Sequence, residues 1–62
     1  MNEYDYKITF LNDQGYVSGT EYCTSTGETE DDARDKAHSY AEDELDTVSS
    51  YDDYEIELID AH

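Results

Sequence analysis

The sequence predicts an α+β fold: a two-layer β-β-α-β sandwich in which one helix covers one face of a three-stranded antiparallel sheet. Apolar and polar residues alternate in stretches near both ends of the chain, which is typical of half-buried strands. Between these stretches, alanines recur at helical spacing in a segment dense in carboxylates. A chain of 62 residues has room for a single domain, so we assign residues 1–62 to one domain.

The first strand is predicted over residues 4–11, YDYKITFL. Tyrosine, isoleucine and phenylalanine occupy every second position, so their side chains share one face of an extended chain. The opposite face carries Asp5, Lys7 and Thr9. This is the most apolar of the predicted strands, and we expect it at the centre of the sheet.

A second strand is predicted to return from the first through a tight turn. Residues 12–15, NDQG, have the composition of a turn. Residues 16–24 then form the second strand of a hairpin, which Gly19 is expected to weaken. Residues 25–28 are expected to form a loop before the helix.

The helix is predicted to begin after Thr29, whose side chain suits an N-cap, and to run for about four turns. The acids that follow Thr29 favour the positive end of the helix dipole. One face is a narrow apolar stripe formed by Ala33, Ala37, Tyr40, Ala41, Leu45 and Val48. The opposite face is almost entirely carboxylate and carries Asp31, Asp32, Asp35, Glu42, Asp43 and Asp46.

The third strand is predicted over residues 54–59, YEIELI, after residues 49–53 end the helix. Successive elements reverse direction, so this strand can pair antiparallel with the first, which gives the sheet order 2-1-3. The predicted core consists of Tyr4, Tyr6, Ile8, Phe10, Ala37, Tyr40, Ala41, Leu45, Ile56 and Leu58.

The charge of the chain excludes several functions. The formal net charge is −15, from 18 acidic and 3 basic residues. Direct binding to nucleic acid is not expected, because affinity for phosphate comes mainly from Lys and Arg, and an anionic membrane surface is excluded for the same reason. The longest apolar run has two residues, too short to span a bilayer. The single Cys23 and the lack of a signal peptide favour a reducing, cytoplasmic setting.

Neither catalysis nor a dedicated metal site is expected. His38, His62 and Cys23 belong to no catalytic motif, and abundant carboxylates carry no information about catalysis without a pocket. Residues 13–21 and 52–61 do not match the calcium-binding loop of EF-hands, and no Cys/His spacing suits zinc. We therefore predict a protein that is not an enzyme and that needs no cofactor.

The uniform sign of the helix charge is the main indication of function. A solvated helix face usually mixes both signs, and uniform charge destabilises a compact state. A helix rises about 1.5 Å per residue, so the carboxylates from Asp31 to Asp46 extend over about 22 Å, the length of about six base pairs. We expect this face to mimic a nucleic acid backbone and to bind a basic groove of a partner protein. The predicted partner-binding residues are Asp31, Asp32, Asp35, Glu42, Asp43, Asp46, Tyr51, Asp52 and Asp53.

Another class of function also accounts for the charge. The chain would then be a small structural or adaptor domain whose acidity keeps it soluble, with a dimer formed through the open sheet face. Adaptation to high salt is a special case of this alternative. One Arg, two Val and seven Tyr fit poorly with the GC-rich coding of many halophiles. A contiguous acidic band with exposed Tyr inside it favours mimicry, whereas an even spread of charge favours solubility.

In size, charge and element order, residues 4–59 resemble the small acidic inhibitors encoded by bacteriophages. These include DNA-mimic anti-restriction and anti-CRISPR proteins, and a short phage inhibitor of bacterial RNA polymerase. The resemblance implies stoichiometric inhibition of a host nuclease, CRISPR effector or polymerase, in the cytoplasm of the host cell, by a monomer or dimer. No motif of these inhibitors aligns with the chain, so the resemblance assigns no residue a role.

Overall fold

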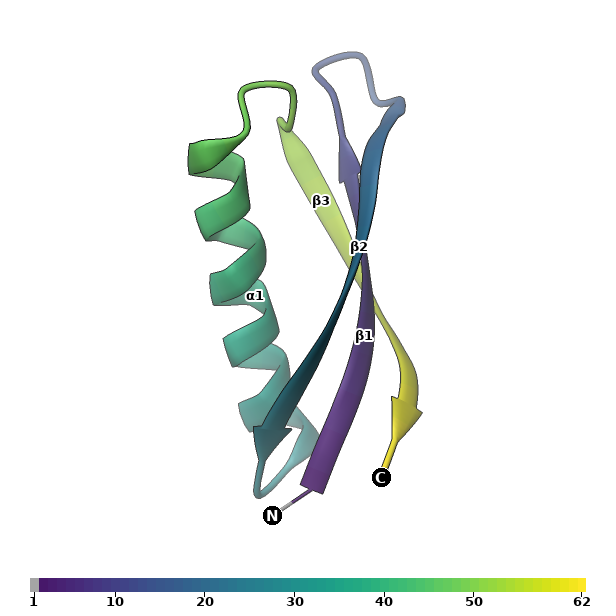
Figure 1. Ribbon diagram of the computed structural model, residues 1–62, viewed down its shortest axis with the longest axis vertical. Coiled ribbons are helices and arrows are strands. Elements are labelled where there is room, and N and C mark those ends of the chain that lie inside the picture. The colour runs from purple at the N-terminus through teal and green to yellow at the C-terminus, as the bar shows by residue number, and fades with distance from the viewer. Residues whose placement is uncertain (1) are drawn as a thin grey trace.

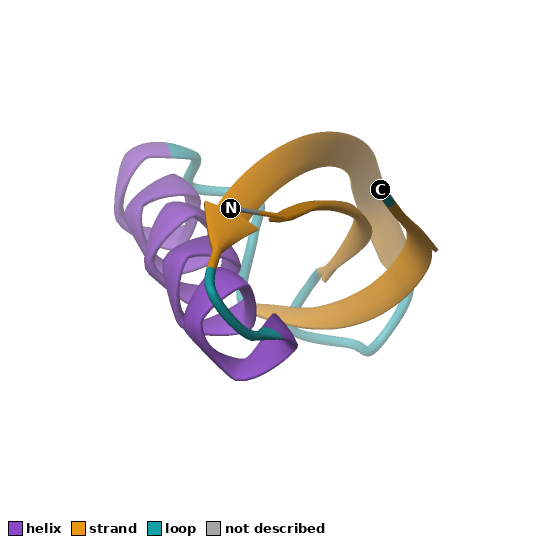
Figure 2. Cartoon of the chain, turned by 90° about the horizontal axis from the view of Figure 1, so that it is seen from below, coloured by secondary structure: helices purple, strands orange, loops and turns teal. Residues whose placement is uncertain are grey.

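The computed structural model describes residues 2–62 and confirms the predicted fold (Figure 1). The elements follow one another as β1 (Asn2–Leu11), β2 (Val17–Gly27), α1 (Glu30–Thr47) and β3 (Asp53–Ala61). The three strands form one antiparallel sheet in the order β2-β1-β3, and α1 lies along one side of it. Figure 2 shows that the sheet is curled, with the helix packed against one side of it.

Local capping and turn interactions define the element ends where the sequence places them. The hydroxyl oxygen of Thr29 accepts a hydrogen bond from the backbone N–H of Asp32 at 3.3 Å, which confirms the N-cap. In the β1–β2 turn, the side-chain oxygen of Asn12 accepts hydrogen bonds from the backbone of Gln14, at 2.9 Å, and Tyr16, at 3.0 Å. Gly15 adopts a φ of 85°, which glycine reaches without a Cβ clash.

The loop predicted over residues 25–28 is wrong for most of its length, because β2 continues to Gly27. Ser25 is buried, and its hydroxyl donates a 2.8 Å hydrogen bond to the carbonyl oxygen of Ala33. A Cβ on Gly27 would lie 2.9 Å from the backbone nitrogen of Ala33. The strand therefore extends until it contacts the first turn of α1, and the serine and glycine allow that close approach.

The core lies between β1 and the alanines of α1. Tyr6, Ile8 and Phe10 are fully buried on the inner face of β1. The small alanine side chains bring the helix backbone close to these residues, which a larger side chain would prevent. The buried apolar residues are Tyr4, Tyr6, Ile8, Phe10, Ala33, Ala37 and Ala41.

Two members of the predicted core lie at its edge instead. Tyr40 is 38% exposed, and its hydroxyl donates a 2.7 Å hydrogen bond to Glu21 on β2. Leu58 is 37% exposed because α1 packs mainly against β2 and less closely against β3. Placing both side chains in the core was therefore wrong, while Leu45 and Ile56 pack against the core as half-buried residues.

Tyr51 closes the end of the core near the C-terminus of α1. Its ring stacks on Phe10, with 4.2 Å between the ring centroids and 5° between the ring planes. On β2, Gly19 lies opposite Phe10, and a Cβ there would collide with the Tyr51 ring. Gly19 has no side chain, and the ring of Tyr51 fills the space that a side chain at this position would occupy.

We predict that Ile8→Ala lowers the free energy of unfolding by about 2–5 kcal/mol, because it leaves a cavity in the centre of the core. The total expected for a domain of this size is only about 3–5 kcal/mol. Val17→Ala, at a side chain that is 65% exposed, is the control and should change stability by less than about 0.5 kcal/mol. Urea denaturation followed by circular dichroism measures both, and equal losses would contradict the assignment of the core.

Tyr51→Ala should lower the free energy of unfolding by about 1–3 kcal/mol, because it removes the stacked ring over Phe10. Tyr51→Phe keeps the ring and should stay within about 0.5 kcal/mol of the wild type. The same urea titration compares the two variants. A Tyr51→Ala protein as stable as the wild type would show that the ring does not contribute to the core.

Candidate partner-binding surface

The helix presents its carboxylates to solvent, opposite the buried alanines. This surface, called the acidic face from here on, consists of Asp31, Asp32, Asp35, Glu42, Asp43 and Asp46. All six residues are exposed. The periodicity of the helix accounts for this arrangement, because residues that share a helical face with Ala37 are buried and those on the opposite side are not.

The two basic residues of α1 do not neutralise the acidic face. Arg34 forms a bidentate pair with Glu30, at 2.7 Å from Nη2 to Oε1 and 3.2 Å from Nε to Oε2, and this contact raises the pKa of the guanidinium. Lys36 donates a 2.6 Å hydrogen bond to the backbone carbonyl of Thr26. Among residues 2–62, no carboxylate of the acidic face takes part in an ion pair.

The C-terminal end of α1 keeps its acids at an electrostatic cost. Glu30 and its two acidic neighbours in the first turn lie at the positive end of the helix dipole, which they stabilise. The last turn has no basic residue, and Asp43 and Asp46 lie near the negative end of the dipole, where carboxylates are unfavourable. The acidic face therefore continues into a region where it weakens the helix.

The loop after α1 and the first residue of β3 add two more exposed carboxylates, Asp52 and Asp53. The backbone N–H of Asp52 donates a 2.8 Å hydrogen bond to the carbonyl of Leu11, which ties the loop to the end of β1. Tyr51 in the same loop is half-buried on the core, as described above. Eight of the nine residues predicted to bind a partner are thus exposed, and Tyr51 lies mainly inside.

Exposed tyrosines occur at the border of the acidic face and on the hairpin. Tyr40 lies on α1 beside Glu21, whose hydrogen bond raises the pKa of the phenol to about 12. Tyr16 and Tyr22 are 69% and 66% exposed and belong to the β1–β2 hairpin. No tyrosine lies among the six carboxylates themselves. Burial, followed by the charge of the nearby Glu42, raises the pKa of the half-buried Tyr54.

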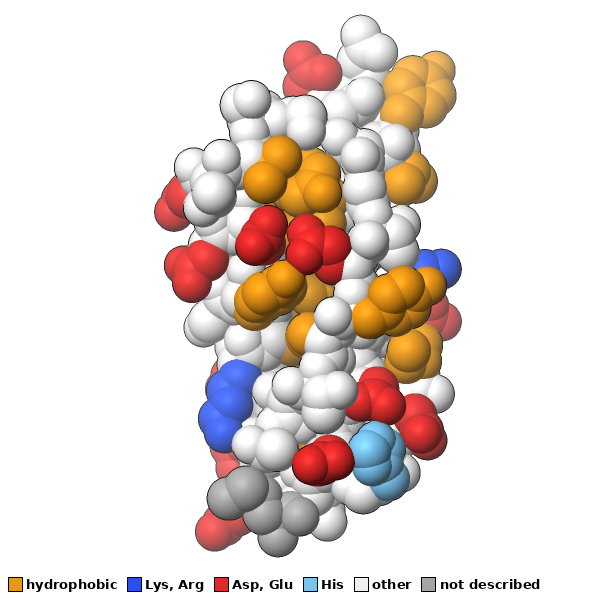
Figure 3. All heavy atoms as spheres, in the orientation of Figure 1, with side chains coloured by type: hydrophobic (Ala, Val, Ile, Leu, Met, Phe, Trp, Pro, Cys, Tyr) orange, Lys and Arg blue, Asp and Glu red, His pale blue; other side chains and the backbone are white. Residues whose placement is uncertain are grey.

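Negative charge also covers the face of the sheet that points away from α1. Glu55 and Glu57 are exposed on β3, and Lys7 lies opposite Glu57 in the β1–β3 register. Figure 3 shows acidic side chains over the strands as well as along the helix. Exposed negative charge therefore lies on both the helix and the sheet, and the acidic face itself contains no basic residue.

The outer face of the sheet also has apolar side chains and a shallow hollow of about 270 Å³, lined by Asp5, Tyr22, Cys23, Thr24 and Ile59. Tyr22 and Ile59 are exposed. Cys23 is half-buried, and burial, with smaller contributions from two carboxylates, raises the pKa of its thiol. Cys23 lies opposite Tyr6 and packs against the core, so its side chain belongs to the inner side of the sheet.

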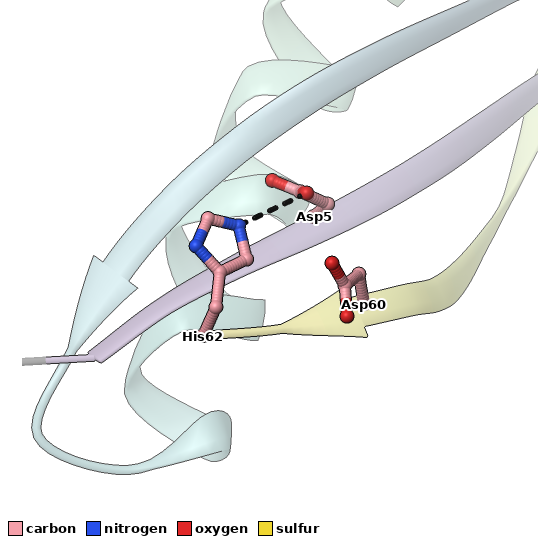
Figure 4. Close-up of side chains that lie close together, drawn as sticks. All are labelled: Asp5, Asp60 and His62. Carbon is pink, nitrogen blue, oxygen red and sulfur yellow. Dashed lines mark hydrogen bonds and ion pairs between the residues drawn. The ribbon is translucent and has the colours of Figure 1, made fainter.

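The sequence analysis missed a group of ionisable residues at one end of the outer face (Figure 4). The β1–β3 register shifts between Asp5 and Tyr6, so Asp60 lies opposite Asp5 instead of following the inward pattern of Leu58. His62 then reaches Asp5, with 3.2 Å between Nε2 and Oδ2. This contact raises the pKa of the imidazole, while Thr24 and then His62 lower the pKa of the Asp5 carboxyl.

No signal in the sequence indicates this group. Asp5 and His62 are 57 residues apart, and they meet only because β1 and β3 are neighbours with a shifted register. In a regular strand, Asp60 would share the inner face with Ile56 and Leu58, because side chains alternate. The irregularity turns Asp60 and His62 to the outer face.

Comparison with known proteins finds no relative: no family model, curated protein or solved structure matches this chain. In residues 2–62, no helix has the length and apolar character needed to cross a bilayer. Proposals about function therefore rest on the surface of the molecule itself.

We predict that the melting temperature rises as sodium chloride increases from about 0.01 to about 0.3 M, because the Debye length falls from about 30 Å to below 10 Å and repulsion among the carboxylates is screened. Tetramethylammonium chloride is the control, since it screens charge without binding carboxylates tightly. Differential scanning fluorimetry measures the series. A melting temperature that falls with both salts would show that ion pairs outweigh repulsion.

Proposed function

We propose that this chain is a non-enzymatic, stoichiometric inhibitor that occupies a basic nucleic-acid-binding groove of a partner protein. The acidic face supports this proposal, because its six carboxylates are exposed and unpaired on one rigid element. Asp31 and Asp46 are separated by about 22 Å along the helix, at about 1.5 Å per residue. Duplex DNA carries one charge for about every 1.7 Å of axis. With six carboxylates over its length, the acidic face carries negative charge at about half that density.

The observation that carries the proposal is the placement of acids where the fold does not benefit from them. Asp43 and Asp46 lie near the negative end of the dipole of α1, and no basic residue of the last turn compensates them. A small domain has little stability to lose. Residues that break a local rule without a compensating structural gain are most often explained by function, and here the function would be recognition of positive charge.

Tyr40 is the aromatic residue best placed to add specific contacts to this electrostatic surface. It lies on α1 beside the acidic face, is 38% exposed, and is held by its hydrogen bond to Glu21. Tyrosine is enriched among the residues that dominate binding energy in interfaces. We assign Tyr40 an anchoring role in place of Tyr51, one of the residues predicted to bind the partner, since Tyr51 packs on the core.

The partner in this proposal is a host nuclease, a CRISPR effector or a polymerase, in the cytoplasm of a bacterial cell. This part follows from the likeness of the chain to small acidic phage inhibitors in size, charge and element order. Such partners have grooves lined by Lys and Arg, which bind phosphates and would accept carboxylates at similar spacing. Electrostatic complementarity of this kind mainly accelerates association.

A second candidate function is a small acidic adaptor whose charge serves solubility. It is favoured by the spread of charge onto the outer sheet face at Glu55 and Glu57, and by the exposed apolar side chains of Val17, Tyr22 and Ile59. In this case the outer sheet face, and not α1, would contact the partner or a second copy. The two candidates therefore differ in which side of the molecule binds.

The test is displacement of labelled duplex DNA from a panel formed by a restriction nuclease, a CRISPR effector nuclease and a bacterial RNA polymerase. We expect the wild-type chain to displace DNA from at least one of them at a fixed stoichiometry, and less effectively at 0.3 M than at 0.1 M salt. The helix variant Asp35→Lys/Glu42→Lys/Asp46→Lys should lose displacement while remaining folded, because these residues are exposed.

A matched variant on other parts of the surface, Asp13→Lys/Glu55→Lys/Glu57→Lys, changes the charge by the same amount at exposed positions away from α1. It should still displace DNA. Equal loss of DNA displacement in both triple variants would show that only net charge matters. Loss of displacement in the Asp13/Glu55/Glu57 variant alone would place the contact on the sheet and favour the second candidate function. Simultaneous binding of DNA and the wild-type chain to every enzyme that it contacts would overturn mimicry.

A further inference from the structure

The sheet places the ionisable residues Asp5, Asp60 and His62 near one another, at the N-terminal end of β1 and the C-terminal end of β3. Two backbone hydrogen bonds join Glu3 and His62, at 2.6 and 2.7 Å, so the strand ladder holds the backbone of His62. Two residue pairs further along the sheet, Asp5 lies directly opposite Asp60. An irregularity of this kind re-aims side chains, and it is frequent next to functional sites.

Side-chain nitrogen and oxygen atoms of these three residues lie close to one another (Figure 4). One donor atom each from Asp5, Asp60 and His62 lies within 4.8 Å of the other two. The Nε2 atom of His62 is 3.2 Å from Oδ2 of Asp5. Two ligands at about 2.0–2.2 Å from one zinc ion are about 3.0–3.5 Å apart in tetrahedral or octahedral geometry. Small side-chain rotations, chiefly of Asp60, would bring all three to that distance.

A hydrogen bond to Asp5 and a charged neighbour of His62 support two of these residues from outside the group. Thr24, on the other neighbouring strand, donates a 2.7 Å hydrogen bond to Oδ1 of Asp5, which leaves Oδ2 directed at His62. The Nδ1 atom of His62 faces Oε2 of Glu3 at 3.4 Å. A histidine that binds a metal through one ring nitrogen usually donates the other N–H to a carboxylate, and ligating carboxylates are themselves hydrogen-bonded.

The direct opposition of Asp5 and Asp60 also indicates a cation. Like charges directly opposite each other in an antiparallel pair are destabilising. Among residues 2–62, neither carboxylate forms an ion pair with lysine or arginine, and His62 is the only ion-pair partner of Asp5. A cation bound between the two carboxylates would remove this repulsion.

We propose that Asp5, Asp60 and His62 bind a divalent transition-metal ion of the zinc class on the outer face of the sheet. The imidazole favours zinc and its first-row neighbours over Mg²⁺ and Ca²⁺, which prefer oxygen ligands alone. Two carboxylates and one imidazole leave at least one coordination position for water or for a ligand from a partner. Glu3 and Thr24 are positioning residues that orient His62 and Asp5.

The ion would join the end of β3 to β1. Because its ligands come together only in the folded chain, binding stabilises the native state by mass action. This inference is independent of the proposed inhibition, since the site lies on the sheet and the acidic face lies on α1. It also departs from the expectation that the chain has no dedicated metal site.

The experiment titrates the metal-free 62-residue chain with zinc chloride in an isothermal calorimeter at 0.15 M sodium chloride and neutral pH. We expect one ion per chain and a melting temperature that rises with the zinc concentration. His62→Gln and Asp60→Asn should each weaken zinc binding at least tenfold. Glu3→Gln and Thr24→Val should weaken it about 10- to 100-fold, as loss of the outer-shell partners of metal ligands does in other metal sites.

Two controls separate a built site from the general attraction of cations to an acidic protein. Asp46→Asn removes the same charge from α1, and His38→Gln removes the other imidazole; both should bind zinc as the wild type does. Magnesium chloride at equal concentration should produce a smaller thermal shift. Proton NMR of the imidazoles should show zinc-dependent shifts of the His62 signals that exceed those of His38.

Zinc affinity that is unchanged in His62→Gln, or reduced equally in Asp46→Asn, would overturn the proposal. So would a magnesium effect as large as that of zinc. Circular dichroism of each variant checks that its fold is intact, which we expect because the substituted side chains lie at the surface. Asp60→Asn gives a second, independent reading if His62→Gln alters the end of β3.

Discussion

The packing of three alanines of α1 onto the inner face of β1 is the interaction on which the rest of the structure depends. Ala33, Ala37 and Ala41 are almost completely buried, and they bring the helix close enough to cover Tyr6, Ile8 and Phe10. A contact made by small side chains is narrow. It leaves most of the circumference of α1 in solvent, where the sequence places carboxylates. The mode of packing thus provides the core of the domain and, as a consequence, an extended acidic surface.

This narrow contact also explains why the domain closes its core with aromatic side chains from outside the helix. α1 packs more closely on β2 than on β3, so the inner side chains of β3 are only partly covered. Tyr51 stacks on Phe10 over Gly19. A 2.8 Å hydrogen bond joins the Tyr54 hydroxyl to Nδ1 of His38. The abundance of tyrosine suits this role, because each ring buries apolar area while its hydroxyl reaches a polar partner or water.

The high net charge is arranged in two different ways on the two sides of the molecule. On α1 the carboxylates are exposed and separate, and the basic side chains are turned aside to Glu30 and Thr26. On the outer sheet face, Asp5 is held by Thr24 and by His62. The first arrangement suits long-range attraction to a large basic surface, whereas the second suits a small cation. The two arrangements lie on opposite layers of the structure.

The sequence by itself determined the features that depend on local periodicity. Alternation in residues 4–11 and 54–59, the N-cap at Thr29 and the alanine spacing of α1 all predicted the observed elements, the strand order and the exposure of eight site residues. Only the tertiary structure decided the burial of Tyr51 and the meeting of Asp5 with His62. The contact of Asp5 with His62 depends on strand register, and a shift of one residue moves a side chain to the opposite face of a sheet. Tyr51 is half-buried because the loop after α1 places its ring on Phe10, over Gly19. Register is set by the packing of the whole chain, which is why these contacts between distant residues could not be read from local patterns.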